Sequence, residues 1–337
     1  MWNLMLNEDE AMIAESVRAY LAAERPLESM RPKAAAIDFA AVREGMAKLG
    51  WFSIGLPEAV GGGGLSLVEE MLIQRELGRS LVSPSTLSIV LAGHICSLAG
   101  DDALAREVVS GEGSVGLGLV FPGAAARATR AYAFDWERAS PIVAWTDEGM
   151  GLFPAEAFGN VQGDSCIDNS VTMHVGDLAL SKATYWISSS TAPLLMRARV
   201  MLAAALTGLA EHACTMTVDY ARIRQQFGRP IGTFQAVKHR CADMGVRARL
   251  AWYQTSLACL KVQAGANDAE LQVASALLVA ADAAHENGRA GIQMHGGIGF
   301  QAECDVHWFM KRAHVYEQLA GGRQAQSQRA LAHFATG

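Results

Sequence analysis

The residues best suited to binding a charged ligand lie between Arg222 and Met244, where an apolar helical region is interrupted and then resumes. Arg222 and Arg224 end the incoming helix, where positive charge is favourable next to the helix dipole. Phe227 follows within a short turn. The simpler interpretation is a helix–turn–helix corner. The sharper hypothesis is a turn that offers guanidinium groups, backbone N–H groups and an aromatic face to a planar, anionic ligand.

Two glycines and a proline predict the turn within this corner. Gly228 and Gly232 can take positive φ, and Pro230 disfavours helical geometry at the residue before it. Thr233 is then the expected N-cap of the helix that resumes at Phe234.

Two further glycine-rich breaks interrupt the helical pattern. Residues 56–66, LPEAVGGGGLS, include four consecutive glycines, which form a loop because glycine loses the most backbone entropy on ordering. Such a loop lets another backbone segment or a ligand come close, and Ser66 is the expected cap of the helix that follows. Residues 295–300, HGGIGF, form the second break.

Composition bounds the class of protein. The chain has 337 residues, of which 51% are hydrophobic and 18% are charged, so it can form two or three domains with substantial cores. A net charge of −6 with scattered basic residues argues against nucleic-acid binding. Six cysteines without CxxC pairs or metal-like spacing indicate reduced core thiols and no metal site. Because no basic leader and no membrane-length apolar run is present, we expect a soluble, cytoplasmic protein without membrane partners.

Hydrophobic periodicity predicts a mainly α protein in three parts. Residues 1–112 would form an N-terminal helical domain, 113–183 a small β domain, and 184–337 a C-terminal helical domain. The C-terminal helices are long and have short links, which favours an up-down four-helix bundle. The expected helices cover residues 8–24, 39–49, 67–78, 86–99, 196–222, 234–264, 269–294, 306–316 and 323–334. The expected strands cover residues 115–120, 131–134, 141–145, 151–153 and 170–175.

In this order and spacing, the motifs resemble those of the acyl-CoA dehydrogenase family along nearly the whole chain. The resemblance rests on the loop at 56–66, RELGR at 75–79, the pattern R-x-x-F-G-x-P-I at 224–231, and Q-x-H-G-G at 293–297. It implies the family's fold of an α domain, a small β domain (here truncated) and a C-terminal four-helix domain. It also implies α,β-dehydrogenation of an acyl-CoA thioester by a flavin.

The same resemblance implies FAD as cofactor, lying across a subunit interface. The resemblance assigns Arg224 and Phe227 to the diphosphate region of FAD, and Gln293 and Gly297 to the far end of this cofactor. Gln235 and Gly296 are assigned to the same site beside them. A guanidinium suits phosphate oxygens, and glycine lets the backbone approach a ligand. In the family, the flavin ring of that FAD reacts inside the neighbouring subunit. The expected partner is therefore a homologous catalytic subunit, or a second copy of this chain.

The family's catalytic base is missing from both positions where the resemblance places it. One position falls on Ala320 and the other on Ala198, and alanine cannot take a proton. Glu317, three residues before Ala320, is a weak candidate for a relocated base. Its simpler interpretation is a surface or capping carboxylate. Glu211, inside a long helix, has no better claim.

Residues that the family places around the flavin ring are also missing. Residues 121–126 read FPGAAA in place of the family's strand and loop, and the following stretch looks deleted. Trp186-Ile187-Ser188 imitates a second flavin-contact motif but comes too late, at the start of the helical domain. Gly322 removes a hydroxyl expected near the ring.

The missing residues would act on a flavin ring in this chain's own pocket, whereas the retained ones would hold the adenosine half of a partner's FAD. The sequence therefore favours a non-catalytic subunit of a heteromeric acyl-CoA dehydrogenase. It is similar to the shorter subunits of the α2β2 enzymes that degrade steroid side chains, so a steroid-CoA thioester is the expected substrate. The alternatives are a self-sufficient homo-oligomeric flavoenzyme with a base such as Glu317, and a scaffold homologue that binds no flavin.

Overall fold

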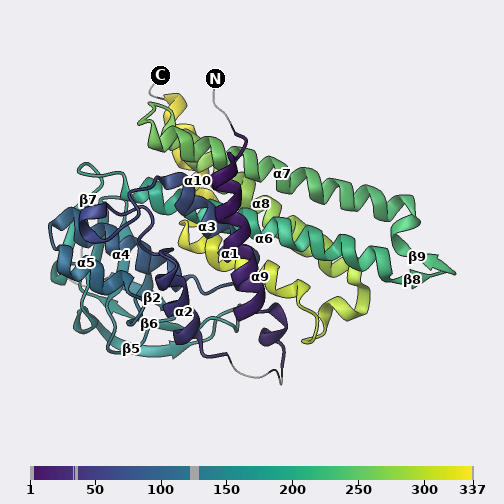
Figure 1. The fold of residues 1–337 in the computed structure, drawn as a ribbon, viewed down its shortest axis with the longest axis horizontal. Coiled ribbons are helices and arrows are strands. Elements are labelled where there is room, and N and C mark those ends of the chain that lie inside the picture. The colour runs from purple at the N-terminus through teal and green to yellow at the C-terminus, as the bar shows by residue number, and fades with distance from the viewer. Residues whose placement is uncertain (1–3, 33, 35–36, 122–128, 336–337) are drawn as a thin grey trace. The chain divides into compact units, whose positions relative to one another are not determined.

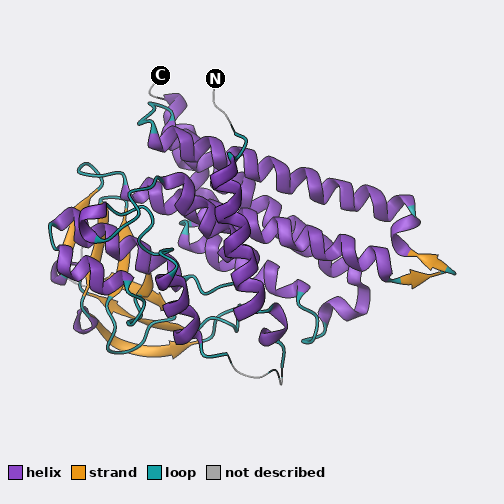
Figure 2. Ribbon diagram, in the orientation of Figure 1, coloured by secondary structure: helices purple, strands orange, loops and turns teal. Residues whose placement is uncertain are grey.

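The computed structural model describes residues 4–32, 34, 37–121 and 129–335, and it is mainly helical with a small sheet (Figure 1, Figure 2). The chain divides into two compact units. We call residues 1–37, 71–82 and 199–337 the helical unit, and residues 38–70 and 83–198 the sheet unit. Helices at both ends of the chain and a small sheet between them confirm the predicted fold class. The division into three domains at residues 112 and 183 stays a prediction.

The helical unit is organised around α6 (Leu194–Ile223). Every residue from Val200 to Ala210 is buried, as expected for a helix that is apolar on all sides and lies inside a bundle. Among the described residues, no helix is both long and apolar enough to span a membrane. The C-terminal bundle is completed by α7 (Gln235–Gln263), α8 (Ala269–His295), α9 (Val306–Leu319) and α10 (Gly322–Ala335), with α8 in contact with the other three. The N-terminal part adds α1 (Glu8–Glu24) and most of α3 (Leu67–Arg79).

Two glycines let α3 and α6 cross with their backbones in contact. A Cβ atom on Gly208 would lie 2.0 Å from the carbonyl oxygen of Arg75, and one on Gly78 would lie 2.3 Å from that of Ala205. Any larger side chain at either position would therefore force the two helices apart.

Gly208→Ala is expected to lower the free energy of unfolding by about 1–3 kcal/mol, because α3 and α6 must separate to admit the methyl group. Urea unfolding followed by circular dichroism measures the change. The matched control is Gly245→Ala in α7, where nothing lies within 4 Å of the added Cβ. There, the better helix propensity of alanine should raise the stability by up to about 1 kcal/mol. Similar effects at both positions would contradict the backbone-contact explanation.

The sheet unit contains a seven-stranded sheet in the order β5-β6-β2-β1-β3-β4-β7. β1 and β3 pair in parallel, and the other neighbours pair in antiparallel fashion. The strands are β1 (Gly116–Val120), β2 (Thr129–Phe134), β3 (Ile142–Thr146), β4 (Gly149–Phe153), β5 (Phe158–Asp164), β6 (Met173–Leu178) and β7 (Tyr185–Ser188). Helix α4 (Ser85–Ala99) is buried along most of its length and contacts β1, β3, β4 and β7. The unit also contains α2 (Phe39–Lys48) and α5 (Asp102–Val109).

The structure corrects the sequence analysis at two strands. β5 was not predicted, because its sequence FGNVQGD is rich in turn formers and it lies mostly exposed at the edge of the sheet. Trp186-Ile187-Ser188 does not begin the helical domain, since these residues form β7 and pair with β4. A Cβ on Gly149 or Gly151 would lie within 2.9 Å of the Trp186 ring, so these glycines make room for it. The sequence predicts that residues 121–126 depart from the family's strand and loop around the flavin ring. Of these, residues 122–126 lie outside the described residues.

The loop with four glycines folds tightly onto its own backbone. A Cβ on Gly62 would lie 2.2 Å from the carbonyl oxygen of Leu56, so the backbone that comes close here is the loop's own. Ser66 caps α3 as expected, because the N–H of Val68 donates to its hydroxyl at 3.1 Å. The N–H of Ser66 in turn donates to the carboxylate of Glu69 at 2.8 Å, so two backbone N–H groups at this helix start are satisfied by side chains.

A buried ion cluster joins α3, α4 and α6 within the sheet unit. The carboxylate of Glu70 lies 2.6 Å from His94 Nε2 and also pairs with Arg197. Burial by itself raises the pKa of Glu70, but the charges and hydrogen bonds of His94 and Arg197 outweigh burial and hold this pKa below its ordinary value. Gly55 leaves the space for this carboxylate, because a Cβ there would lie 2.1 Å from Oε1.

Candidate functional site

The corner after α6 is a β-hairpin. β8 (Gln225–Gln226) pairs with β9 (Arg229–Pro230). The two residues between them, Phe227 and Gly228, have φ values of 52° and 75°, as a two-residue hairpin turn requires. The predicted turn is thus confirmed, in the form of a short hairpin at the end of the long helices of the helical unit (Figure 1).

Two details of the predicted corner are wrong. Gly232 does not take positive φ, and glycine is needed there because a Cβ would lie 2.9 Å from the carbonyl oxygen of Ala221. Thr233 does not cap α7, since its hydroxyl donates to the carbonyl oxygen of Pro230 at 2.7 Å. Phe234 occupies the N-cap position and makes no side-chain hydrogen bond. The first N–H groups of α7 therefore have no side-chain cap.

Two side chains of the corner, those of Arg224 and Phe227, are exposed to solvent. Arg224 is exposed, and its guanidinium has no partner in the part of the chain that the structure describes. Arg222, by contrast, pairs with Asp219 at 3.3 Å. Phe227 is 91% exposed. The corner therefore presents an uncommitted guanidinium beside an accessible phenyl ring.

The second glycine-rich break follows α8 as a 3₁₀ turn, η6 (Gly296–Phe300). Gly296 has a φ of 64°, which favours glycine. Gly297 has no positive φ, and a Cβ there would meet nothing within 4 Å. The chain's own fold therefore does not require glycine at position 297. Gln293, in the last turn of α8, is exposed on the same segment.

Tyr220 and His295 hold the two turns at one end of the helical unit. Their rings stack with centroids 4.1 Å apart. Tyr220 lies one turn before Arg224, whose N–H donates to the Tyr220 carbonyl oxygen at 2.8 Å. Burial lowers the pKa of His295, and its Nδ1 lies 2.7 Å from the carbonyl oxygen of Gly291. The sequence alone does not reveal this pair, because the two residues are 75 positions apart and no local spacing links them.

A charged cleft of about 510 Å³ lies between α7 and α8 and includes Gln293. A volume of this size suits a small ligand. Arg289 pairs with Glu286 at 2.7 Å, whereas Arg240 has no partner among the described residues. Arg240 and Arg247 recur at helical spacing on one face of α7, a signal that the sequence analysis did not use. The lining residues are Ala236, His239, Arg240, Asp243, Arg247, Glu286, Arg289, Ala290 and Gln293.

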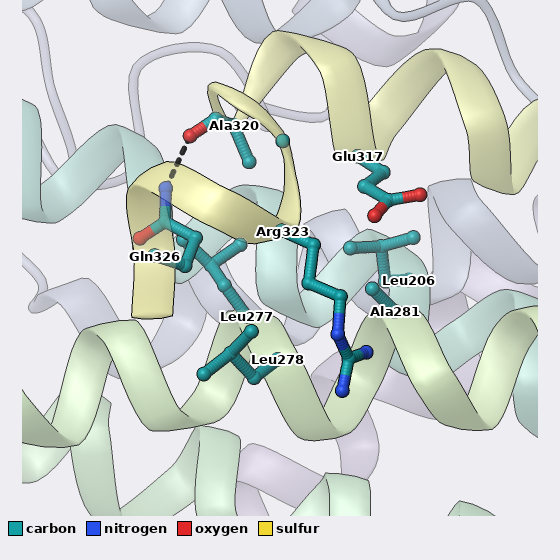
Figure 3. Close-up of a pocket in the computed structure, with 9 residues that line it drawn as sticks. Leu206, Leu277, Leu278, Ala281, Glu317, Ala320, Arg323 and Gln326 are labelled. Atoms are coloured by element: carbon teal, nitrogen blue, oxygen red, sulfur yellow. Dashed lines mark hydrogen bonds between the residues drawn. The ribbon is translucent and has the colours of Figure 1, made fainter. Parts of the chain in front are cut away.

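Neither expected base position carries a carboxylate. Ala198 is buried near the start of α6, and Ala320 is buried at the C-cap of α9. Gln326 donates to the carbonyl oxygen of Ala320 (Figure 3). Gly321 and Gly322 have φ values of 94° and 78°, so this segment is a tight link between α9 and α10. Neither alanine can take a proton from a substrate.

Both candidates for a relocated base, Glu317 and Glu211, are already paired. Glu317 lies 2.8 Å from His285 Nε2 and its side chain is only 20% exposed, so it is not a surface or capping carboxylate. With Ala320 it lines a cavity of about 10 Å³ (Figure 3), which is room for about one water molecule. Glu211 pairs with Arg75 at 2.8 Å.

Comparison with known proteins relates this geometry to a family. Residues 7–111 match the model described as acyl-CoA dehydrogenase, N-terminal domain, and residues 189–333 match the one described as acyl-CoA dehydrogenase, C-terminal domain. The chain is 32% identical over 281 residues to acyl-CoA dehydrogenase IpdE2 of Mycobacterium tuberculosis, an alignment that covers 81% of this chain and 79% of IpdE2. It is 30% identical over 323 residues to acyl-CoA dehydrogenase FadE34 of the same organism. That alignment covers 93% of this chain but only 44% of the length of FadE34.

Solved structures agree on the fold. A chain of the ChsE4-ChsE5 complex from Mycobacterium tuberculosis superposes with a TM-score of 0.80 at 22% identity, with 99% of each chain covered. A chain of the steroid ACAD Tcur3481-Tcur3483 superposes with a TM-score of 0.78 at 22% identity, with 98% of each chain covered. Because both domain models match and most of IpdE2 aligns with it, this chain belongs to the acyl-CoA dehydrogenase family.

Proposed function

We propose that this chain is a non-catalytic subunit of a heteromeric, FAD-dependent acyl-CoA dehydrogenase and that it completes the FAD site of a catalytic partner. The observation that carries the proposal is an exposed, uncommitted Arg224 in a chain with alanine at both base positions, Ala198 and Ala320. Such a chain can hold a phosphate-bearing cofactor but cannot abstract the substrate proton.

The residues of the corner fit the phosphate-rich half of FAD. Arg224 can pair with diphosphate oxygens, and the uncapped N–H groups at the start of α7, from Gln235 onward, favour the same negative charge. Phe227 offers an aromatic face for packing against a flat group. When bound, FAD supplies the acceptor for the hydride that leaves the acyl-CoA.

The turn after α8 fits the adenosine end of the same cofactor. Gln293 offers an amide that can both donate and accept hydrogen bonds. The backbone at Gly296 and Gly297 is open to a ligand, and the glycine at 297 is unexplained by the chain's own packing. Arg240 adds a guanidinium without a partner in the described chain to the adjoining cleft. These features support a site that continues from the Arg224 corner into the cleft.

A homologous catalytic subunit is the proposed partner, and a steroid side-chain CoA thioester is the proposed substrate class. The shared fold of the ChsE4-ChsE5 complex supports a two-chain enzyme, and that of the steroid ACAD supports the substrate class. In this assembly Arg224 and Gln293 would bind and orient the cofactor, while proton abstraction would belong to the partner.

A self-sufficient enzyme that uses Glu317 as its base has one observation in its favour, the cavity that Glu317 shares with Ala320. Two observations weigh against it. The carboxylate is paired with His285, and the cavity of about 10 Å³ has no room for an acyl chain. The non-catalytic subunit is therefore the better-supported function.

The chain purified alone is expected to be colourless, because it offers only one half of a FAD site. Co-expressed with a homologous catalytic subunit, it should yield a complex with one FAD per heterodimer. The measurement is flavin absorbance after denaturation, divided by the amount of each subunit. A yellow chain that oxidises acyl-CoA alone would instead support the homo-oligomeric enzyme. If the partner holds the same amount of FAD without this chain, the alternative function, a scaffold that binds no flavin, would be supported.

A further inference from the structure

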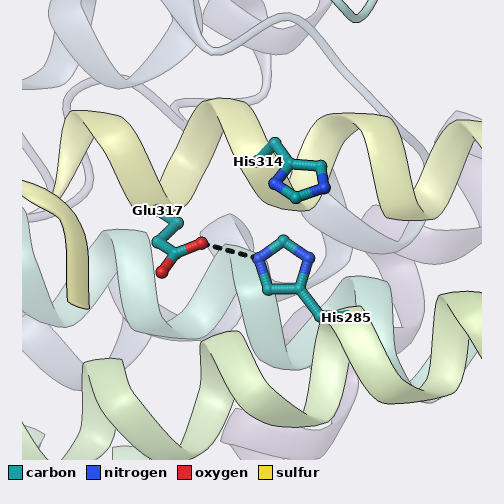
Figure 4. Close-up of side chains that lie close together, drawn as sticks. All are labelled: His285, His314 and Glu317. Carbon is teal, nitrogen blue, oxygen red and sulfur yellow. Dashed lines mark hydrogen bonds and ion pairs between the residues drawn. The ribbon is translucent and has the colours of Figure 1, made fainter.

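Three potential metal ligands meet between α8 and α9 of the helical unit. His285 comes from α8, and His314 and Glu317 come from α9 (Figure 4). One ligand atom from each lies within 4.8 Å of the other two. The His285 and His314 rings have centroids 4.3 Å apart, and Glu317 lies 2.8 Å from His285 Nε2. None of these residues belongs to the proposed FAD site.

The helix geometry explains why the three side chains converge. His314 and Glu317 are three residues apart on α9, so they share one face of that helix. α8 packs along α9 and brings His285 opposite them. Helical bundles bind metals through a glutamate and a histidine three residues apart, with further ligands from facing helices. Here the order is reversed, with His314 before Glu317. The sequence alone did not predict this site, because His285 is far from the other two residues along the chain.

We propose that His285, His314 and Glu317 bind a divalent cation of the zinc class, with solvent in the fourth position. Zinc takes neutral histidine nitrogen and carboxylate oxygen at about 2.0–2.2 Å, which places tetrahedral ligands about 3.4 Å apart. The ligand atoms now lie within 4.8 Å of one another, so ion binding would draw them closer by up to about 1.4 Å. All three side chains come from regular helices, which hold them in place, and Glu317 remains accessible enough for an ion to enter.

The surroundings can accommodate the added positive charge. Glu317 supplies a negative charge, and the two arginines nearby, Arg289 and Arg323, are already paired with Glu286 and Asp282.

One buried atom also bears on the site. His285 Nδ1 is buried and has no hydrogen-bond partner among the described residues. The other ring nitrogen, Nε2, lies 2.8 Å from the Glu317 carboxylate, so it is the atom through which His285 would bind the ion. The ion would then clamp α8 to α9 one turn before Ala320 and stabilise the folded chain by linkage.

The test is zinc binding by the complete, tag-free chain after treatment with a chelator, measured by titration calorimetry. We expect one ion per chain. His285→Ala, His314→Ala and Glu317→Gln should each weaken binding by at least about 100-fold. His239→Ala is the matched control, because it removes an exposed histidine of α7 outside the cluster and should leave the affinity unchanged.

Two further measurements separate ligation from packing. His314→Cys keeps a zinc ligand at the same position and should retain binding that His314→Ala loses. Cobalt in place of zinc should give the visible absorption of a tetrahedral site in the wild type and not in Glu317→Gln. Absence of saturable zinc binding in the wild type, or equal affinity in all variants, would overturn the proposal.

Discussion

Replacing Arg224 with alanine is expected to weaken FAD binding by the two-subunit complex by about 10- to 150-fold, or about 1.5–3 kcal/mol for one charge-assisted contact. The guanidinium is exposed and has no partner in the described chain, so the substitution removes a ligand contact without breaking one inside the protein. The measurement is the Kd of FAD for the flavin-free complex, from the change in flavin fluorescence. Size-exclusion chromatography should show that the complex itself is intact.

Arg222→Ala is the matched control for this prediction. It removes the same charge from the same helix end, but its guanidinium already pairs with Asp219. Its effect on the FAD Kd should stay within about twofold, because an exposed charge without direct contact is screened by salt. Arg224→Lys should be intermediate, since lysine keeps the charge but not the planar fork. An unchanged Kd in Arg224→Ala would contradict the proposed function and support a scaffold without flavin.

Glu70→Ala is expected to lower the free energy of unfolding by about 3–5 kcal/mol, because the substitution removes the buried carboxylate that pairs with His94 and with the partly buried Arg197. Glu70 is 2% exposed and pairs with both His94 and Arg197. Urea unfolding measures the loss. Glu107→Ala, at an exposed glutamate of α5, is the control and should change stability by less than about 0.5 kcal/mol. Comparable losses at both glutamates would argue against a special role for the buried cluster.

The same carboxylate predicts a pH dependence of stability. The pKa of Glu70 in the folded state lies below its ordinary value of 4.5, so the folded protein favours the ionised form more than the unfolded chain does. The stabilisation is therefore complete above pH 4.5 and is lost as the pH falls through the folded-state pKa. As the pH is lowered below 4.5, the melting temperature of the wild type should fall more steeply than that of Glu70→Gln. Parallel curves for the two proteins would show that Glu70 does not contribute in this way.

The long helices could be predicted because their signal is local. α6 and α8 carry apolar side chains at helical spacing over many turns, and glycine-rich breaks mark where they end. The sheet was harder to predict, because β5 lacks a strand-like sequence and the strand-like residues of β7 resembled a different motif. β5 is polar because it lies at an edge, and β7 looked like a misplaced motif until its pairing with β4 was seen.

The candidate FAD site could be predicted in part. The motif residues Arg224 and Gln293 were found from the sequence, and the structure shows both exposed at turns of the helical unit. The stack of Tyr220 on His295, which ties those turns together, could not be found, because it depends on how α6 and α8 pack. The capping of α7 was predicted wrongly, since Thr233 donates its hydroxyl to the backbone of the hairpin instead.

The sequence by itself determined the helices, the glycine-rich turns, and the alanines at positions 198 and 320, because these depend on residue type and local spacing. Only the tertiary structure decided which side chains are free and which are committed. Arg224 is left without a partner in the described chain, whereas Glu317 is paired with His285 from another helix. Pairing of this kind depends on distances between segments far apart in the chain, and packing of the helices sets those distances.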